Sequence, residues 1–223
     1  MTNTIYIVRH GQTEWNLLGK TQGHGNSDLT PKGIEQAELL EQRYMNKTPS
    51  KRIFSVSTQD YIYSSDLGRA YQTAEIIGNK LNIEVEKTEA LREMNFGTWE
   101  GRIIKDIIEE DPELYKMWRN EPHIAKIPQG ETLSQIKERT DAFIKEINEK
   151  YDGKHIVLVT HSLCARIMLL SFLDSDVKNI YRINQANTAL NIIELRDYGP
   201  VVMKMNDTTH IINDTKLENS ALE

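Results

Sequence analysis

Two continuous runs of apolar residues stand out along the chain, and both predict strands buried on two faces. Ile5-Tyr6-Ile7-Val8 and Ile156-Val157-Leu158-Val159 lack the alternation of polar and apolar residues that a half-exposed strand shows. Such runs are typical of the interior of a parallel sheet. Each run ends in a polar turn, Arg9-His10-Gly11 in the first case and Thr160-His161-Ser162 in the second.

Apolar residues spaced three or four positions apart predict helices after these strands and after a third, shorter strand at 61–63. The remaining predicted elements are helices at 31–44, 67–81, 132–151 and 164–173, a strand at 83–85, and a closing hairpin of strands at 189–195 and 201–205. Thr30-Pro31 provides an N-cap and a proline at the first helical position, and Thr132 to Gln135 has capping-box spacing. Residues 46–60 are predicted as a loop.

The alternation of strands and helices predicts the α/β class, with a three-layer α/β/α arrangement and a mostly parallel central sheet. In such sheets ligands bind beyond the carboxyl ends of the strands, where the two polar turns would meet. We expect one domain over residues 1–206, with a lid-like insertion at about 97–130 in which Asp111-Pro112 separates two short helices. Residues 207–223 are predicted to form a C-terminal tail.

Composition narrows the function classes. The 223 residues are 39% hydrophobic and 27% charged, as in ordinary globular proteins, and the net charge of −6 gives no reason to expect nucleic acid or an anionic membrane as a partner. No apolar run approaches the ~20 residues that cross a bilayer. The first residues lack a basic, apolar leader, so we expect a cytoplasmic protein. The oligomeric state is left open.

Several common site motifs are incomplete. Gly19-Lys20-Thr21 lacks the glycine that a nucleotide-binding loop carries five residues earlier, where Glu14 stands. No HExxH motif occurs, Cys164 is the single cysteine and is expected to be a small buried residue, and no two histidines lie three or four positions apart. We therefore expect no metal site. His10 alone fits a structural histidine at a strand end as well as a catalytic one.

Five motifs occur in order along residues 4–206. They are Arg9-His10-Gly11-Gln12-Thr13-Glu14-Trp15-Asn16 followed by Gln22-Gly23, Ser64-Ser65-Asp66-Leu67-Gly68-Arg69-Ala70, Leu91-Arg92-Glu93, Gly130-Glu131-Thr132, and Val159-Thr160-His161-Ser162. The series resembles the histidine phosphatase superfamily, also called the phosphoglycerate mutase-like family. That resemblance implies a phosphoglycerate mutase-like fold and a site for phosphoryl transfer.

By resemblance, the expected catalytic residues are His10, Glu93, Arg9, Arg69 and His161, and the expected substrate-binding residues are Asn16, Gln22, Gly23 and Ser162. His10 would be the nucleophile, with its second ring nitrogen bonded to a backbone carbonyl of the same turn. The arginines would clamp the phosphate, and Glu93 would protonate the leaving oxygen and later activate water.

Several of these residues also fit a structural or solvent-exposed role without any part in catalysis. Arg69 could be a solvated helix charge, Glu93 a charge at a helix N-terminus, and Arg92 either a partner of the site or a solvated side chain. The remaining histidines and the large residues near the insertion are expected to be structural, packing or surface residues: His24, His123, His155, His210, Met94, Trp99 and Trp118.

The phosphatase branch of the family is favoured over the mutases. The mutases keep a Tyr-Gly after the acid and a tandem arginine further on, whereas this chain reads Glu93-Met94-Asn95-Phe96-Gly97 and has only Arg102 and Arg119 before Pro128. We expect a histidine acid-type phosphatase that hydrolyses small phosphorylated metabolites through a phosphohistidine, without metal or cofactor. The alternatives are a phosphoglycerate mutase and a non-catalytic phospho-ligand-binding protein. Specificity is expected to lie in the insertion and in the loop at 20–26.

Overall fold

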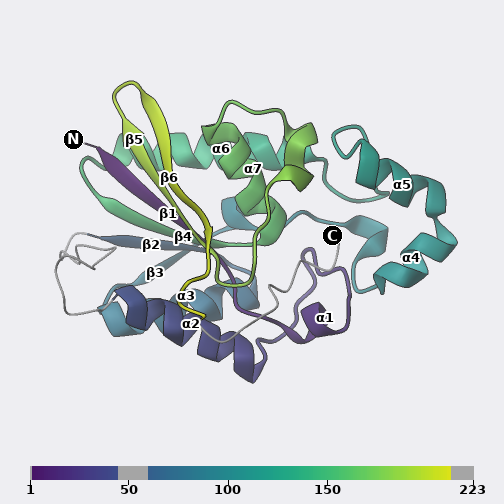
Figure 1. Ribbon diagram of the computed structural model, residues 1–223, viewed down its shortest axis with the longest axis horizontal. Coiled ribbons are helices and arrows are strands. Elements are labelled where there is room, and N and C mark those ends of the chain that lie inside the picture. The colour runs from purple at the N-terminus through teal and green to yellow at the C-terminus, as the bar shows by residue number, and fades with distance from the viewer. Residues whose placement is uncertain (1, 45–59, 212–223) are drawn as a thin grey trace.

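The computed structural model describes residues 2–44 and 60–211, and its centre is a six-stranded sheet with helices on both faces (Figure 1). The strands are β1 (Asn3–Arg9), β2 (Tyr61–Ser65), β3 (Val85–Thr88), β4 (His155–Thr160), β5 (Leu190–Arg196) and β6 (Gly199–Asp207), in the order β3-β2-β4-β1-β5-β6. Strands β3, β2, β4 and β1 are parallel, and the β5–β6 hairpin continues the sheet in antiparallel fashion. The three-layer, mostly parallel fold predicted from the sequence is confirmed.

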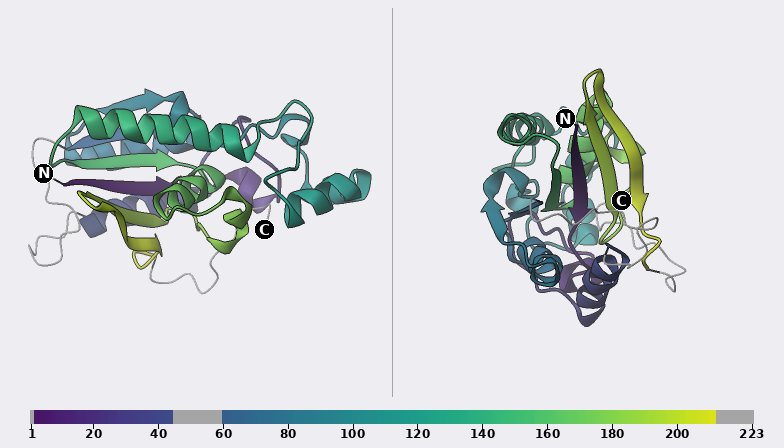
Figure 2. Two further views of the ribbon diagram at one scale, coloured as in Figure 1. Left: turned by 90° about the horizontal axis from the view of Figure 1, so that it is seen from above. Right: turned by 90° about the vertical axis from the view of Figure 1, so that its left-hand side faces the viewer.

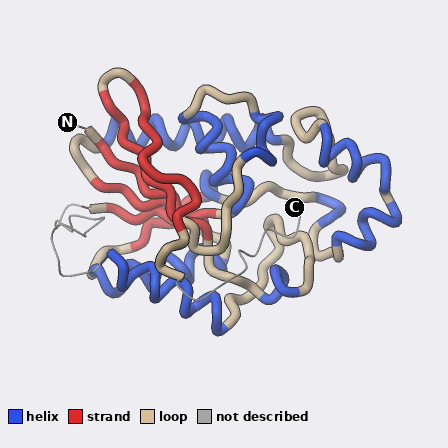
Figure 3. The backbone as a smooth tube through the Cα atoms, in the orientation of Figure 1, coloured by secondary structure: helices blue, strands red, loops and turns tan. Residues whose placement is uncertain are grey.

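Alternating side chains of the central strands build two separate cores. Ile5 and Leu158 belong to the core on one face, and Val8 and Val157 belong to the core on the other. The first face is covered by α6 (Leu133–Lys150) and α7 (Ser162–Phe172), and the second by α2 (Pro31–Tyr44) and α3 (Gly68–Leu81) (Figures 2 and 3). The two apolar runs of the sequence are therefore buried on both sides, as their pattern predicts.

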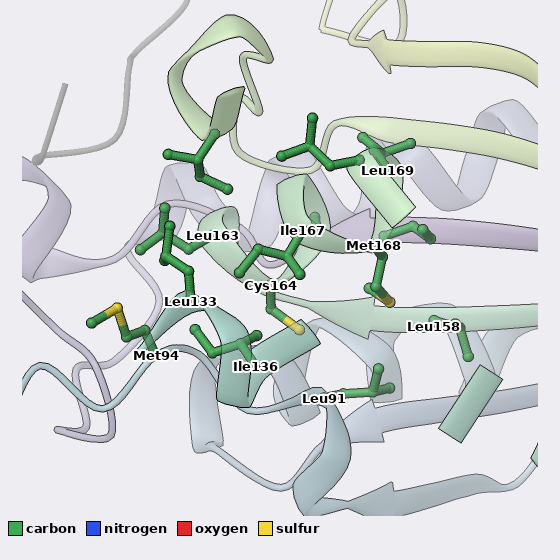
Figure 4. Close-up of a cluster of buried hydrophobic side chains, with 14 of the residues drawn as sticks. Leu91, Met94, Leu133, Ile136, Leu158, Leu163, Cys164, Ile167, Met168 and Leu169 are labelled. Atoms are coloured by element: carbon green, nitrogen blue, oxygen red, sulfur yellow. The ribbon is translucent and has the colours of Figure 1, made fainter. Parts of the chain in front are cut away.

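The core between the sheet and α7 contains the single cysteine. Figure 4 shows the Cys164 side chain among Ile136, Ile167 and Leu91. The residue is fully buried, and burial raises the pKa of its thiol to about 11. Cys164 is a small apolar core residue, as expected.

The insertion forms an arm at one end of the molecule (Figure 1). It contains a 3-10 turn at Gly97–Trp99, α4 (Ile104–Glu110) and α5 (Pro112–Asn120), and the two helices meet at the predicted Asp111-Pro112 break. Trp118 is fully buried, and its ring contacts Trp99, Phe96 and Tyr181 edge to face at centroid distances of 6.4, 5.8 and 6.3 Å. The tryptophans are packing residues, as expected.

The predicted strand at 83–85 is placed too early for a local reason. Strand β3 begins at Val85, because Ile83 donates its N–H to the carbonyl of Gly78 across a left-handed Asn82 and so completes the end of α3. A short helix, α1 (Glu14–Leu17), and a 3-10 helix at Val177–Arg182 were not predicted.

The predicted tail also begins too early. Strand β6 continues to Asp207, and the buried His210 shares a hydrogen bond with Thr188 at 2.9 Å. Residues 212–223, and all of the predicted 46–60 loop except Asp60, lie outside the described residues. Within the described ranges, no helix has the length and apolar character needed to span a bilayer.

Candidate active site

The parallel pairing of β1 with β4 places the two histidine turns side by side. Arg9 pairs with Thr160 at the carboxyl ends of these strands, and His10 and His161 follow directly. The two imidazole rings have centroids 5.1 Å apart and planes inclined by 60°. Both rings are buried, with exposures of 3% for His10 and 0% for His161. The strand ends therefore form the polar crevice that the topology predicts.

The protonation of His10 follows from its hydrogen bonds. Its Nδ1 lies 2.7 Å from the carbonyl oxygen of Gly11, which can only accept, so Nδ1 carries the proton. Nε2 accepts a bond from the Nε–H of Arg69 at 3.3 Å. Burial, followed by the charges of Arg69 and Arg9, lowers the pKa of His10 well below its usual value. His10 is thus a neutral imidazole with the lone pair on Nε2.

Arg69 is fixed by the loop that follows the first histidine turn. It lies in the first turn of α3, and its two Nη groups donate to the carbonyls of Gly25 at 2.9 Å and Gly23 at 2.7 Å. Three of its five N–H groups are engaged in these bonds and in the bond to His10, which leaves two for a ligand. Its exposure is 1%, which excludes a solvated helix charge.

Gly23 is required by the same loop. Its φ is +52°, and a Cβ there would lie 2.1 Å from a carboxylate oxygen of Glu100. That carboxylate accepts the N–H groups of His24, Gly25 and Phe96. Glu100 therefore ties the loop that holds Arg69 to the segment that follows Glu93.

Glu93 is held by three backbone N–H groups. Its carboxylate accepts from Met94 at 3.0 Å, and from Leu163 and Cys164 in the first turn of α7 at 3.1 and 3.2 Å. Glu93 is therefore a negative charge at the N-terminus of a helix, as its alternative interpretation predicts. The same side chain also lines the pocket that contains His10. One carboxylate therefore both accepts the N–H groups of α7 and faces the candidate site.

His161 and Ser162 offer donors without a partner in the described part of the chain. Ser65 Oγ accepts the N–H of Leu67 at 3.3 Å and lies 2.9 Å from Nε2 of His161. With the Ser65 hydroxyl donating to Nε2, the proton of a neutral His161 lies on Nδ1. That atom and the hydroxyl of Ser162 are buried and make no hydrogen bond there.

Eight of the nine expected site residues line one pocket. They are Arg9, His10, Asn16, Gln22, Gly23, Arg69, Glu93 and Ser162. The ninth, His161, adjoins the pocket through its contact with His10. Asn16 accepts the N–H and hydroxyl of Thr13 at its Oδ1, so its Nδ2 is the group left to meet a ligand.

The segment that carries Glu93 is held by contacts that were not predicted from the sequence. Arg139 on α6 donates to the carbonyls of Ala90 at 2.7 Å and Arg92 at 2.8 Å, and its Nε contacts Glu131 at 3.2 Å. These bonds fix the backbone that carries Glu93. Arg92 itself forms a two-pronged ion pair with Asp66, which decides between its two interpretations in favour of a structural partner of the site.

Residues 5–208 match the family model described as the histidine phosphatase superfamily (branch 1). The chain belongs to this superfamily. Phosphoserine phosphatase 1 of Hydrogenobacter thermophilus is 31% identical to it over 207 residues, 93% of either chain. The probable phosphoglycerate mutase GpmB of Yersinia pestis is 31% identical over 212 residues, covering 93% of this chain and 94% of the relative. The structure of Bacillus stearothermophilus YhfR has a TM-score of 0.84 and 28% identity, covering 94% and 99% of the two chains.

The pocket of this superfamily member is also lined by residues that were not singled out from the sequence. They are Lys20, Thr21, Phe96, Leu163, Arg166 and Tyr181. The 20–26 loop contributes to the lining, whereas none of the described lining residues comes from 97–130. Residues of the insertion nevertheless contact the lining residues: Gly101 and Arg102 exchange backbone hydrogen bonds with Thr21, and Trp118 packs against Phe96 and Tyr181.

Arg166 had a detectable signal in the sequence. It is the single charged residue of α7, which is otherwise read as an apolar helix. A charge on a buried helix needs a partner or a ligand, so such a position marks a candidate site residue.

Proposed function

We propose that this chain is a metal-independent phosphatase that hydrolyses small phosphomonoesters through a phosphohistidine at His10. The observation that carries the proposal is the state of His10, a buried neutral ring whose Nε2 lone pair faces Arg69 in a pocket lined by cations. A neutral imidazole is a nucleophile, and fixed cations stabilise the charge on the transferred phosphoryl oxygens.

The proposed reaction has two steps. Nε2 of His10 attacks phosphorus, the bond to the ester oxygen breaks, and Glu93 gives its proton to that leaving oxygen. Water then attacks the phosphohistidine, Glu93 takes the proton of the water, and the bond between phosphorus and nitrogen breaks to release phosphate. Arg9 and Arg69 hold the phosphoryl oxygens in both steps, which is why no metal ion is required.

The contacts of the remaining residues support these assignments. The carbonyl of Gly11 accepts from Nδ1–H, so this proton stays in place while Nε2 becomes bonded to phosphorus. Nδ1 of His161, Nδ2 of Asn16 and the hydroxyl of Ser162 supply neutral donors to the same oxygens. The nucleophile and the acid line one pocket, which favours catalysis over a protein that only binds phosphorylated ligands.

Phosphoglycerate mutase activity is the second candidate, because a probable phosphoglycerate mutase is 31% identical to this chain. A mutase must retain the released phosphoglycerate and exclude water until it is phosphorylated again. The two activities differ in the fate of the phosphoryl group, so one assay with 3-phosphoglycerate separates them. The proposal predicts inorganic phosphate as the product and no 2-phosphoglycerate.

The proposed function is tested by phosphate release from a panel of phosphomonoesters, with and without exhaustive chelation. We expect hydrolysis that chelation leaves unchanged and that His10→Ala abolishes. His123→Ala is the matched control, because His123 is an exposed histidine outside the pocket. Turnover that survives in His10→Ala, or that requires added Mg²⁺ or Zn²⁺, contradicts the proposal.

A further inference from the structure

The loop that precedes β5 lies directly beside the turn that carries His10. Because β5 is antiparallel to β1, its first residues meet the carboxyl end of β1. The N–H of Arg9 donates to the carbonyl of Ala189 at 3.2 Å, and the N–H of Thr188 donates to the carbonyl of His10 at 3.2 Å. Residues 185–189 are all buried. The sheet topology therefore brings a buried polar segment, distant in the sequence, against the backbone of the proposed nucleophile.

The side chain of Asn187 in this loop joins two parts of the candidate site. Its Nδ2 lies 3.1 Å from the carbonyl oxygen of His10 and 3.4 Å from Oδ1 of Asn16. An amide nitrogen carries two protons, one for each of these acceptors. A backbone carbonyl can only accept, so the nitrogen of the amide, and not its oxygen, must face His10. One buried amide thus connects the nucleophile residue with a residue that lines the pocket.

This contact gives Asn16 a fixed relation to His10. The other donors to Oδ1 of Asn16 are the N–H and the hydroxyl of Thr13, both at 3.0 Å. Thr13 is the N-cap of the short helix that contains Asn16, so its bonds orient Asn16 within its own helix. The bond from Asn187 instead ties Asn16 to the backbone of the proposed nucleophile. With these donors at Oδ1, Nδ2 of Asn16 is directed to a ligand.

The backbone of the same loop is held in a strained conformation. Thr188 has a φ of +51°, in the left-handed region that β-branched residues rarely adopt. In this conformation its N–H bonds the carbonyl of His10, and its hydroxyl shares a hydrogen bond with His210 at 2.9 Å. Such strain persists only where the surrounding contacts offset it, and it is concentrated at functional sites. The loop is therefore fixed against His10 by its backbone and its side chains.

We propose that Asn187 is a positioning residue, which holds the phosphate-binding amide of Asn16 in register with the nucleophile His10. The inference rests on the proposed phosphatase activity and adds a residue to its site. Asn187 is not among the described residues that line the pocket, so it acts through Asn16 and His10 rather than on the substrate. Phosphoryl transfer requires donors at fixed positions around a group that becomes bonded to the nucleophile, so the relative placement of these two residues matters.

The variant Asn187→Leu removes both donors and keeps the size of the side chain. The carbonyl of His10 retains the N–H of Thr188, and Oδ1 of Asn16 retains the two donors of Thr13, which limits the structural damage. We expect kcat/KM for p-nitrophenyl phosphate to fall about 5- to 10-fold, the range of a neutral hydrogen bond. The affinity for inorganic phosphate, measured by calorimetry, should fall about fivefold.

The matched control is Asn179→Leu. Asn179 lies in the preceding 3-10 helix, where its amide donates to the Ser175 hydroxyl at 3.1 Å, outside the described pocket lining. This variant should keep the phosphate affinity and kcat/KM of the unchanged protein. A loss in Asn187→Leu no larger than the loss in Asn179→Leu would overturn the inference.

A double-mutant cycle with Asn16→Ala shows whether Asn187 acts through Asn16. We expect Asn187→Leu to lower the phosphate affinity by less than about twofold when Asn16 is already alanine, because residues that act on one another are not additive. A general structural effect would instead lower the affinity by the same factor in both backgrounds, and that result would overturn the inference. Asn187→Ala removes the same donors from a smaller side chain and should show the same coupling.

The outcomes separate this inference from the proposed function, because phosphate affinity is measured without turnover. Hydrolysis that depends on His10, together with equal effects of Asn187→Leu in both backgrounds, overturns the role of Asn187 and leaves the phosphatase proposal standing. Coupled losses of phosphate affinity in a protein that hydrolyses no ester overturn the phosphatase proposal and retain the link between Asn187 and Asn16. A protein that neither binds phosphate nor hydrolyses esters overturns both.

Discussion

The Nε–H of Arg69 points to Nε2 of His10 across 3.3 Å, and the same guanidinium is fastened to the carbonyls of Gly23 and Gly25. The cation is therefore placed beside the proposed attacking atom before any substrate arrives. Such preorganisation lowers the barrier of a reaction in which charge develops at a fixed position. Because the loop at 23–25 is tied to Glu100, the placement of the cation depends on backbone that lies far away in the sequence.

Arg69→Met is expected to lower kcat/KM by about 10²- to 10³-fold, for esters with good and poor leaving groups alike. In the proposed reaction Arg69 contacts phosphoryl oxygens in the ground state and in the transition state, so its loss raises KM and lowers kcat. Steady-state kinetics with p-nitrophenyl phosphate and an alkyl phosphate provide the measurement. Thermal unfolding serves as the control, since the variant leaves two carbonyls without their donor. Unchanged turnover of the aryl ester would show that Arg69 is structural.

Glu93→Gln separates proton donation from phosphate binding. We expect formation of the phosphoenzyme to slow by about 10²- to 10⁴-fold for alkyl phosphates and much less for p-nitrophenyl phosphate, whose leaving group needs little protonation. The later hydrolysis should be slowed for both, so the aryl ester shows a burst. Glutamine retains an oxygen acceptor for the first turn of α7, which limits the structural damage. Equal slowing for both esters without a burst would assign the proton donor elsewhere.

The contact between Glu131 and Arg139 predicts a positioning effect on Glu93. Glu131→Gln should weaken the hold of Arg139 on the carbonyls of Ala90 and Arg92, and lower kcat for alkyl phosphates by about 10-fold with little change in KM. Lys137→Met removes an exposed ion pair with Asp141 on the same helix and should change kcat by less than about twofold. Similar effects of the two substitutions on kcat would show that Glu131 does not position Glu93.

The buried histidines predict a loss of stability in acid. Burial, with Arg69 as the next cause, lowers the pKa of His10 and of His161 well below the usual 6.5. Below about pH 6.5 the unfolded chain binds protons at these positions that the folded protein does not, so the free energy of unfolding falls as the pH falls. Each histidine contributes a slope of about 1.4 kcal/mol per pH unit.

Urea unfolding of the protein and of His161→Asn between pH 5 and 7.5 measures this slope. The substitution should make the pH dependence shallower by about one proton, whatever its effect on stability at pH 7.5. An identical slope in both proteins would mean that His161 titrates equally in the folded and unfolded states.

The parts of the fold that repeat a local pattern could be predicted from the sequence. The apolar runs at 5–8 and 156–159 specify buried strands, and their shared edge brings the polar turns of His10 and His161 together. The break at Asp111-Pro112 and the capping box at Thr132 are equally local. These features depend on residues within a few positions of one another.

Some of the missed features depend on distant contacts, and others on local signals that the apolar pattern does not carry. The bonds from Arg139 to backbone near Glu93 span more than forty residues and end on carbonyls, which every residue carries. Strand β3 begins later than predicted because the left-handed turn at Asn82 uses Ile83 to end a helix. Arg166 was read as part of an apolar helix, although a lone charge in that helix was the available signal.

The proposed phosphatase reaction depends on a phosphohistidine at His10, and trapping this intermediate tests the reaction directly. The protein is mixed with p-nitrophenyl phosphate, quenched without acid within milliseconds, digested, and mapped by mass spectrometry, in parallel with Glu93→Gln, in which the intermediate should accumulate. We expect one phosphate on His10, at Nε2, and none in His10→Ala. A phosphate on His161, or multiple turnover by Glu93→Gln without any adduct on His10, would contradict it.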